Sequence, residues 1–336
     1  MAGSNCPIVT LTPSPTLDRT YFVKNLVEGG VNRADRVGEE LAGKGINVSR
    51  GLHLAGIPAP GIVPIGDADK GVLERTGSEF LTPLWIEGTL RVSTTVVEYD
   101  GPTTKINEHP RPLKQKDWDA VVELTDKTVR ENKAEWLVVA GAHPEIDETG
   151  EVINLHSLFL RMEALGVKVV LDTSGPALRY WAQQGNATVM KPNAHELAEC
   201  VGRDLTTIGD VIDAAHTLND WGVDCVMASL GVDGIIAVTK THAIHAFTPP
   251  VKVINTVGAG DSTIAGFLSA VTTHPAEPGA FGVGFDVAEG IAAAVQWGAA
   301  KVQQPTSGLQ SIENLVEATV DVDPDRNRLL GEPATA

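Results

Sequence analysis

Short apolar runs rich in β-branched residues recur along the chain, and helical patterns separate most of them. The runs lie at Ile8–Leu11, Trp136–Val139, Val167–Leu171, Thr188–Met190 and Cys225–Ala228. Segments such as 155–165 and 211–221 have helical periodicity and fill the intervals. Continuous apolar strands are typical of a parallel sheet that helices cover on both faces. We therefore predict an α/β fold, with a doubly wound, mostly parallel sheet flanked by helices.

Two segments, 20–37 and 94–107, alternate apolar and polar residues instead. Alternation gives a strand one buried face and one wet face, which predicts a small separate β-sheet inserted at about 18–40 and 90–110. Such a sheet suits a lid over a site or the contact surface of a homodimer. The main domain is then expected to span 1–320, and residues 321–336 to form a loose, polar C-terminal tail.

The bulk composition excludes several classes of partner. The chain has 336 residues, and its 43 acidic and 26 basic residues give a formal net charge of −17. Such a surface repels nucleic acid and anionic membranes, so we expect neither as a partner. The start of the sequence has no signal-peptide pattern, no run reaches about 18 apolar residues, and the three cysteines are too scattered for a disulfide framework. These features predict a cytoplasmic protein.

The strongest local pattern is a glycine-rich turn that opens into a helical sequence. An apolar run at Val251–Ile254, predicted as a strand, precedes the turn Asn255-Thr256-Val257-Gly258-Ala259-Gly260-Asp261-Ser262. Glycine permits a close backbone approach, and the unpaired N–H groups at a helix start bind phosphate, so Gly258, Ala259 and Gly260 form a predicted anion hole. Asp261 beside it could take the proton of a hydroxyl that attacks phosphorus. A helix cap is the alternative role for Asp261.

Two better-known phosphate-binding patterns do not fit this turn. The P-loop pattern G-x-x-x-x-G-K-[ST] is absent from the sequence. A dinucleotide-binding turn needs a small third residue where Thr263 stands, and it lies early in its βαβ unit rather than near the C-terminus.

An ordered set of motifs gives the chain a family resemblance over about residues 8–310. The motifs are Leu17-Asp18-Arg19-Thr20, Asn32-Arg33-Ala34, Ala42-Gly43-Lys44-Gly45-Ile46-Asn47-Val48, Thr104-Lys105-Ile106-Asn107-Glu108, Asp172-Thr173-Ser174-Gly175, Lys191-Pro192-Asn193 and Val257-Gly258-Ala259-Gly260-Asp261. Together they resemble the ribokinase-like, phosphofructokinase B family of sugar kinases. Within that family, the set is most similar to the 1-phosphofructokinase and tagatose-6-phosphate kinase branch.

The resemblance implies ATP and Mg²⁺ as cofactors and assigns residues to the nucleotide side. Lys191 and Asn193 would order the phosphates, and Glu196 would hold a water molecule on Mg²⁺, which keeps much of its hydration shell. A capping box between Asn193 and Glu196 is the structural alternative, and both roles are compatible. The turn from Ser229 through Gly231 to Gly234 would lie along the nucleotide; an ordinary turn is the alternative.

On the sugar side, the resemblance implies that Asp18, Gly43 and Asn47 approach the sugar and its hydroxyls. Lys44 and Arg91 would neutralise the phosphate of the substrate, because cations bind it by charge-assisted hydrogen bonds. The resemblance also adds Arg33, which could come from a partner subunit.

Several residues depart from the family pattern and leave the exact sugar open. Ala42 replaces the first of two usual glycines, Ser93 an asparagine, and Asn255 an aspartate. Ala140-Gly141-Ala142-His143-Pro144 stands where the branch typically has Ser-Gly-Ser-Leu-Pro. Two hydroxyls are thus lost, and His143 is either a new sugar contact or a plain loop residue.

The sequence therefore predicts an ATP-dependent kinase for a phosphorylated ketohexose. Fructose 1-phosphate, converted to fructose 1,6-bisphosphate, is the preferred substrate, and tagatose 6-phosphate and fructose 6-phosphate are the alternatives. A non-catalytic sugar-phosphate sensor on the same fold and a nucleoside kinase are further alternatives. The expected base at Asp261 disfavours the sensor, and the Lys44–Arg91 pair disfavours the nucleoside kinase.

Overall fold

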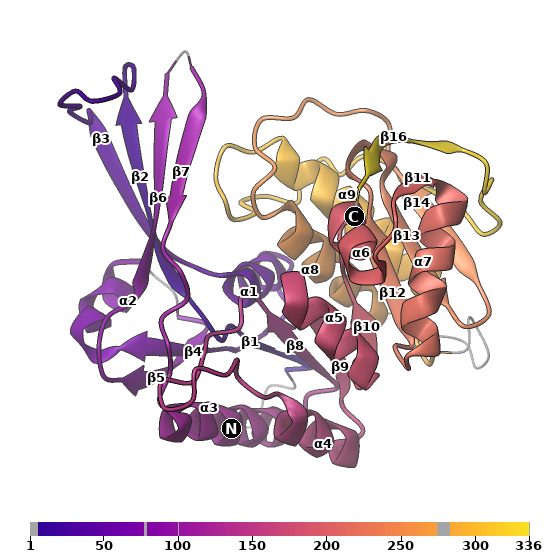
Figure 1. Ribbon diagram of the computed structural model, residues 1–336, viewed down its shortest axis with the longest axis horizontal. Coiled ribbons are helices and arrows are strands. Elements are labelled where there is room, and N and C mark those ends of the chain that lie inside the picture. Colours follow the sequence, from indigo (N-terminus) through magenta and orange to yellow (C-terminus); the bar gives the residue numbers. More distant parts are fainter. Residues whose placement is uncertain (1–5, 77–78, 100, 274–282, 336) are drawn as a thin grey trace.

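The computed structural model describes residues 6–76, 79–99, 101–273 and 283–335, and a ten-stranded sheet forms its centre (Figure 1). The strand order is β15-β14-β13-β12-β10-β9-β8-β1-β4-β5. Neighbours from β5 to β12 are parallel, and β13, β14 and β15 add an antiparallel edge. The bounds are β1 Ile8–Leu11, β4 Gly61–Gly66, β5 Leu81–Ile86, β8 Trp136–Ala140, β9 Lys168–Asp172, β10 Val189–Met190, β12 Cys225–Ser229, β13 Ile235–Thr239, β14 Ala243–Phe247 and β15 Thr319–Asp321.

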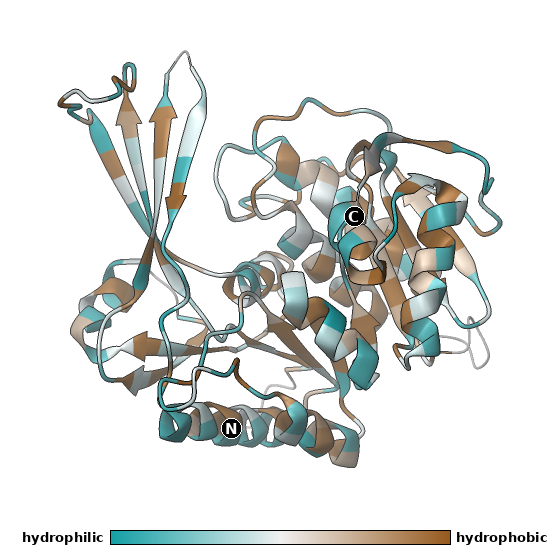
Figure 2. Ribbon diagram, viewed as in Figure 1, coloured by the Kyte–Doolittle hydropathy of each residue, from teal (hydrophilic) through white to brown (hydrophobic). Residues whose placement is uncertain are grey.

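Helices cover both faces of this sheet and enclose two apolar cores. One face carries α1 (Lys44–Leu54), α8 (Ala259–Thr273) and α9 (Val287–Val302). The other carries α3 (Gln115–Asn132), α4 (His156–Leu165), α5 (Gly175–Gln184), α6 (Ala194–Val201) and α7 (Ile208–Asp220). The short α2 (Lys70–Thr76) lies between β4 and β5 in sequence. This arrangement confirms the predicted doubly wound, mostly parallel sheet. Strands that are buried on both faces must be apolar throughout, as Figure 2 shows for β1, β8 and β9.

The order of the central strands fixes where a ligand can bind. Strand β1 pairs with β4 on one side and with β8 on the other, so the winding direction reverses there. In doubly wound sheets, ligands bind beyond the carboxyl ends of the strands at such a reversal. The motifs that follow β1, β8 and β9 therefore meet at one edge of the sheet.

A second sheet of four strands stands off the main domain, in the order β3-β2-β6-β7 (Figure 1). Its strands are β2 Thr16–Val23, β3 Arg36–Ala42, β6 Arg91–Glu98 and β7 Thr103–Asn107. The predicted segment 20–37 contains parts of β2 and β3, and the predicted segment 94–107 contains parts of β6 and β7. Alternating hydropathy bands along these strands are visible in Figure 2, as expected for strands with two different faces. We refer to this four-stranded sheet as the lid sheet.

Two local predictions are wrong. Residues 251–254 form no strand, and Val253 and Ile254 are about half exposed. The expected loose tail at 321–336 is largely ordered: β16 (Leu329–Ala334) pairs antiparallel with β11 (Leu205–Thr207). The segment 321–336 is polar overall, but its Leu330 is buried in the core between the sheet and the helices. Among the residues described, no helix is both long and apolar enough to cross a lipid bilayer.

Candidate active site

The glycine-rich turn lies directly before α8, against the segment that follows α9. Gly258 has φ of 80°, and a Cβ there would lie 1.9 Å from the carbonyl oxygen of Ser307. A Cβ on Gly260 would lie 3.1 Å from Nζ of Lys191. Only glycine fits the first position, because both its φ and its surroundings exclude a side chain. The turn therefore brings its backbone close to a lysine ammonium.

Asp261 lies in the first turn of α8 and is 6% exposed. Its Oδ2 accepts a hydrogen bond of 2.8 Å from Nδ2 of Asn47 in α1. Burial, and then the negative charge of Asp172, raises the pKa of Asp261 to about 6, although Lys44 and Lys191 oppose the shift. A carboxylate with this pKa is still mostly ionised at neutral pH and is a stronger proton acceptor than an ordinary aspartate.

Asp172, at the end of β9, joins two of the predicted lysines. Its Oδ1 accepts a hydrogen bond of 2.9 Å from Nζ of Lys44, and Oδ2 lies 3.8 Å from Nζ of Lys191. Burial would raise the pKa of Asp172, but Lys191 and Lys44 outweigh burial and lower it. Asp172 and Asp261 raise the pKa of Lys44 against the effect of burial. Asp172 and the ionised Asp261 together balance the charges of the two ammonium groups, so this cluster beside the turn is close to neutral.

The sequence prediction did not assign Asp172 to the site, although it quoted the motif that contains it. The position was detectable, because a polar residue ends the apolar strand β9 at the sheet edge where ligands bind. Its partners were not, since Lys44 is 128 residues away in the chain. Arg50 was also missed: its Nη1 donates to Oδ1 of Asn47 at 3.0 Å and forms an ion pair of 2.8 Å with Glu40.

The predicted nucleotide residues lie together at the start of α6 and the end of β12. Asn193 and Glu196 form the capping box, in which each side chain accepts the backbone N–H of the other at 2.9 Å. The backbones of Asn193 and Ser229 also form an isolated parallel β-bridge. Gly231 has φ of 58°, and a Cβ on Gly234 would lie 2.2 Å from the carbonyl oxygen of Ala246. The structure thus gives Gly234 a packing role in the turn.

The side chains near the turn fit a magnesium ion that is bound mainly by the phosphates of a nucleotide. Among the described residues, no group of three or more histidine, cysteine, aspartate or glutamate side chains could hold a metal ion. Mg²⁺ commonly binds phosphate oxygens and water, with one or two carboxylates. Glu196 uses Oε2 in the capping box, which leaves Oε1 able to accept a hydrogen bond from a metal-bound water.

Asp18 and Arg91 lie at the base of the lid sheet and interact with each other electrostatically. Burial, and then Glu40, raises the pKa of Asp18 to about 6, and Arg91 opposes the shift. Arg91 donates to the carbonyl oxygens of Glu108 at 3.1 Å and Ser14 at 3.2 Å, while its buried Nε has no partner among the described residues. Lys44, the other cation predicted for the sugar phosphate, donates instead to Asp172 on β9.

Gly43 and Arg33 have contrasting surroundings. Gly43 precedes α1 with φ of 152°, and a Cβ would lie 2.6 Å from Cγ2 of Thr12, so the backbone approaches the end of β1 closely. Arg33 is exposed in the loop that joins β2 and β3. Figure 1 shows this loop at the tip of the lid sheet. Within the described part of the chain, no hydrogen bond or ion pair joins Arg33 to the other predicted residues.

His143 follows β8 and lies near Lys44. Neither ring nitrogen has a hydrogen-bond partner among the described residues, although both atoms are buried. Burial, and then the charge of Lys44, lowers the pKa of His143 to about 4. The imidazole is therefore neutral at physiological pH and has one donor and one acceptor available.

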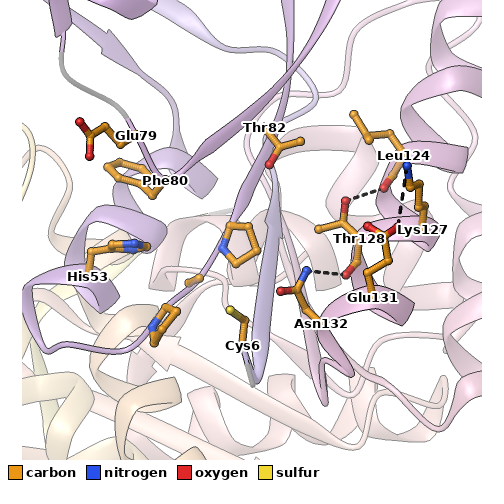
Figure 3. A pocket seen from close by; sticks show the side chains of 13 residues that line it. Cys6, His53, Glu79, Phe80, Thr82, Leu124, Lys127, Thr128, Glu131 and Asn132 are labelled. Atoms are coloured by element: carbon orange, nitrogen blue, oxygen red, sulfur yellow. Dashed lines mark hydrogen bonds and ion pairs between the residues drawn. The ribbon is translucent and has the colours of Figure 1, made fainter. Parts of the chain in front are cut away.

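A pocket of about 400 Å³ lies elsewhere, at the opposite edge of the sheet (Figure 3). Cys6 and Pro60 line it at the amino ends of β1 and β4, whereas the residues described above follow carboxyl ends. Two of its polar groups bond locally in α3: Thr128 donates to the carbonyl oxygen of Leu124 at 2.7 Å, and Asn132 to that of Thr128 at 2.8 Å.

The fold and the site define a phosphotransferase: a doubly wound sheet presents a helix start, a carboxylate and two lysines at its switch point. The family model described as pfkB family carbohydrate kinase matches residues 13–314, and the chain belongs to that family. It is accordingly an ATP-dependent sugar kinase.

Two curated relatives agree with this assignment. The chain is 34% identical to 1-phosphofructokinase of Haloferax volcanii over 272 residues, covering 78% of this chain and 83% of that protein. It is 30% identical over 301 residues to ATP-dependent 6-phosphofructokinase isozyme 2 of Escherichia coli, covering 87% and 93%. A crystal structure of phosphofructokinase-2 from Escherichia coli in complex with potassium has a TM-score of 0.78 and 26% identity, covering 91% of this chain and 96% of that one. These similarities support a sugar-phosphate kinase.

Proposed function

We propose that the protein phosphorylates fructose 1-phosphate to fructose 1,6-bisphosphate with ATP, using Asp261 as general base. The observation that carries the proposal is the buried Asp261 carboxylate, with its raised pKa, beside a glycine-rich helix start. A hydroxyl of the sugar bound against Asp261 would give up its proton as its oxygen attacks the γ-phosphorus of ATP. ADP leaves, and the phosphoryl group ends on the sugar oxygen.

The turn and the lysines would stabilise the charge on the transferred group. Backbone N–H groups of Gly258, Ala259 and Gly260 form the anion hole, and Lys44 and Lys191 supply positive charge held in place by Asp172. Mg²⁺, when bound, neutralises phosphate charge, and Glu196 would hold one of its waters. Asn193, Ser229 and Gly231 would lie along the nucleotide.

The sugar would bind under the lid sheet. Asp18 and Asn47 would accept and donate hydrogen bonds to hydroxyls, with Gly43 allowing the close approach. Arg91 would bind the phosphate already on the sugar, since its buried Nε lacks a partner. Lys44 lies with Asp172 and Asp261, so we assign it to the transferred phosphoryl group at least as much as to the sugar phosphate. Closure of the lid sheet would exclude water and limit hydrolysis of ATP.

A panel of fructose 1-phosphate, fructose 6-phosphate, tagatose 6-phosphate and unphosphorylated fructose tests the proposal through coupled ADP release. We expect the highest kcat/KM for fructose 1-phosphate, because the 1-phosphofructokinase of Haloferax volcanii is 34% identical to the chain and isozyme 2 of Escherichia coli 30%. A preference for fructose 6-phosphate would place the chain with isozyme 2 instead. His143→Leu should change the ranking if the imidazole contacts the sugar, and should leave it unchanged otherwise.

We also propose a homodimer through the lid sheet. Strand register puts Tyr21, Val37 and Val96 side by side on one face, with Ile106 on the same face. Val37 and Ile106 are 50% and 64% exposed. A second copy would cover these side chains and could bring its Arg33 toward the site.

A further inference from the structure

Lys301, in the last turn of α9, is a buried cation that the mechanism above does not use. Its side chain is fully buried, with 0% relative exposure. Nζ donates a hydrogen bond of 3.2 Å to the carbonyl oxygen of Asn255. Among the described residues, no carboxylate lies within ion-pair distance of it, in contrast to Lys44 and Lys191. A buried ammonium without a counter-ion is unfavourable unless another group compensates its charge.

Lys301 lies directly beneath the turn that forms the proposed anion hole. The backbone N–H groups of Ile254 and Asn255 donate to the carbonyl oxygen of Val302 at 2.7 and 3.1 Å, which ties the start of the turn to the end of α9. Cε of Lys301 would lie 3.5 Å from a Cβ on Gly258. The ammonium is therefore packed against the same backbone that presents Gly258 to Gly260.

Two features partly offset the cost of burying this cation. The carbonyl end of a helix is negative, so the last turn of α9 stabilises the ammonium. Asp261 also acts on it: burial lowers the pKa of Lys301 to about 8, and the charge of Asp261 opposes that shift. Neither contact neutralises the charge fully. A phosphate group bound at the turn would supply the missing negative charge.

We propose that Lys301 is an internal cation for phosphoryl transfer, a positioning residue that holds the carbonyl of Asn255 and places positive charge under the anion hole. The inference rests on the proposed role of the turn. An ammonium fixed to the chain would perform the task that a dissolved monovalent cation could otherwise perform at the same carbonyl. The prediction is that a small cation can replace the ammonium when the side chain is shortened.

The test compares Lys301→Met, which keeps the bulk and removes the charge, with Lys301→Ala, which also opens space. Both should lower kcat/KM for ATP about tenfold or more, with a smaller effect on the KM of the sugar. Ammonium or potassium chloride should restore much of the activity of Lys301→Ala, whereas tetramethylammonium chloride at the same ionic strength should not. Wild type and Lys301→Met should not respond to these cations. Lys240→Met, at an exposed position, is the matched control.

Direct measurement of ATP binding separates this inference from the proposed function. Wild type that binds ATP but phosphorylates none of the sugars would contradict the proposed substrate, and the cation dependence of ATP binding would still test Lys301. Unchanged ATP affinity and kcat/KM in Lys301→Met would overturn the inference. So would a loss in Lys301→Ala that no cation relieves, because packing alone would then explain it.

Discussion

At the scale of single residues, the site depends on charges that the fold forces together. Asp261 and Asp172 are both buried, and their mutual repulsion contributes to the raised pKa of Asp261. Lys44 and Lys191 act on the two carboxylates unequally: they lower the pKa of Asp172 below its usual value but only reduce the rise at Asp261. The two aspartates are thus suited to different tasks, one as a fixed anion and the other as a proton acceptor.

Asp261→Asn should lower kcat by about 10²- to 10⁴-fold, because the amide cannot accept the proton of the sugar hydroxyl. ATP affinity, measured by calorimetry, should change little, since the N–H groups of the turn remain. Asp220→Asn, at an exposed position in the last turn of α7, is the control and should behave as wild type. Near-normal turnover of Asp261→Asn would remove Asp261 as the base.

The raised pKa of Asp261 predicts how activity depends on pH. Below its pKa of about 6 the carboxyl is protonated, so kcat should fall about tenfold for each further pH unit. The same shift means that the folded state binds more protons than the unfolded state between about pH 4 and 6, so this group adds stability as the pH falls. Loss of kcat at pH 5 without a lower Tm is therefore expected.

Asp18 provides the control for this pH profile. Its pKa is also raised to about 6, but it lies at the base of the lid sheet. Asp18→Asn should keep the acid limb of kcat and lose pH dependence only in the KM of the sugar. If the acid limb of kcat disappears in Asp18→Asn, the titration belongs to Asp18 and not to Asp261.

At the scale of elements, local sequence patterns predicted the buried central strands correctly but failed for residues 251–254 and for the C-terminal strand β16. The buried strands β1, β8, β9 and β12 and the turn before α8 were recognisable because their residue types match their burial. The segment 251–254 has apolar residues but no neighbouring strand to pair with, so it remains irregular. In strand β16, Leu330 and Ala334 are buried, whereas Leu329 and Glu332 are exposed.

Leu330 and Leu329 test whether β16 stabilises the domain. Leu330 is 6% exposed and packs in the core, whereas Leu329 is 72% exposed. Leu330→Ala should lower the free energy of unfolding by about 2–5 kcal/mol, and Leu329→Ala by less than about 0.5 kcal/mol. Urea denaturation measures both values. Equal, small effects would mean that β16 is dispensable.

At the scale of the whole molecule, the main domain and the lid sheet carry different parts of the candidate site. The main sheet fixes Asp172, Asp261 and the lysines on strand ends and helix starts, which hold them rigidly. Asp18 and Arg91 lie where the lid sheet joins it, so a motion of the lid would change the proposed sugar site. The outer face of the lid sheet exposes apolar side chains that suit a second subunit.

Val37→Glu combined with Ile106→Glu should convert a dimer into monomers, because burying these charges without partners is unfavourable. Sedimentation velocity at micromolar concentration measures the change, and Val322→Glu, at a 59% exposed position outside the lid sheet, is the control. If wild type is already monomeric under these conditions, the dimer proposal is wrong.

The parallel sheet, the glycine-rich turn and the family could be predicted from the sequence, because each depends on residue patterns within short segments. Which charged groups lie together could be seen only in the three-dimensional structure. Lys44 reaches Asp172 across 128 residues, Asn47 reaches Asp261 across 214, and Lys301 lies under Asn255. The pKa values and the unpaired cation follow from these long-range contacts, since burial and distance in space, not position in the chain, set the energy of a charge.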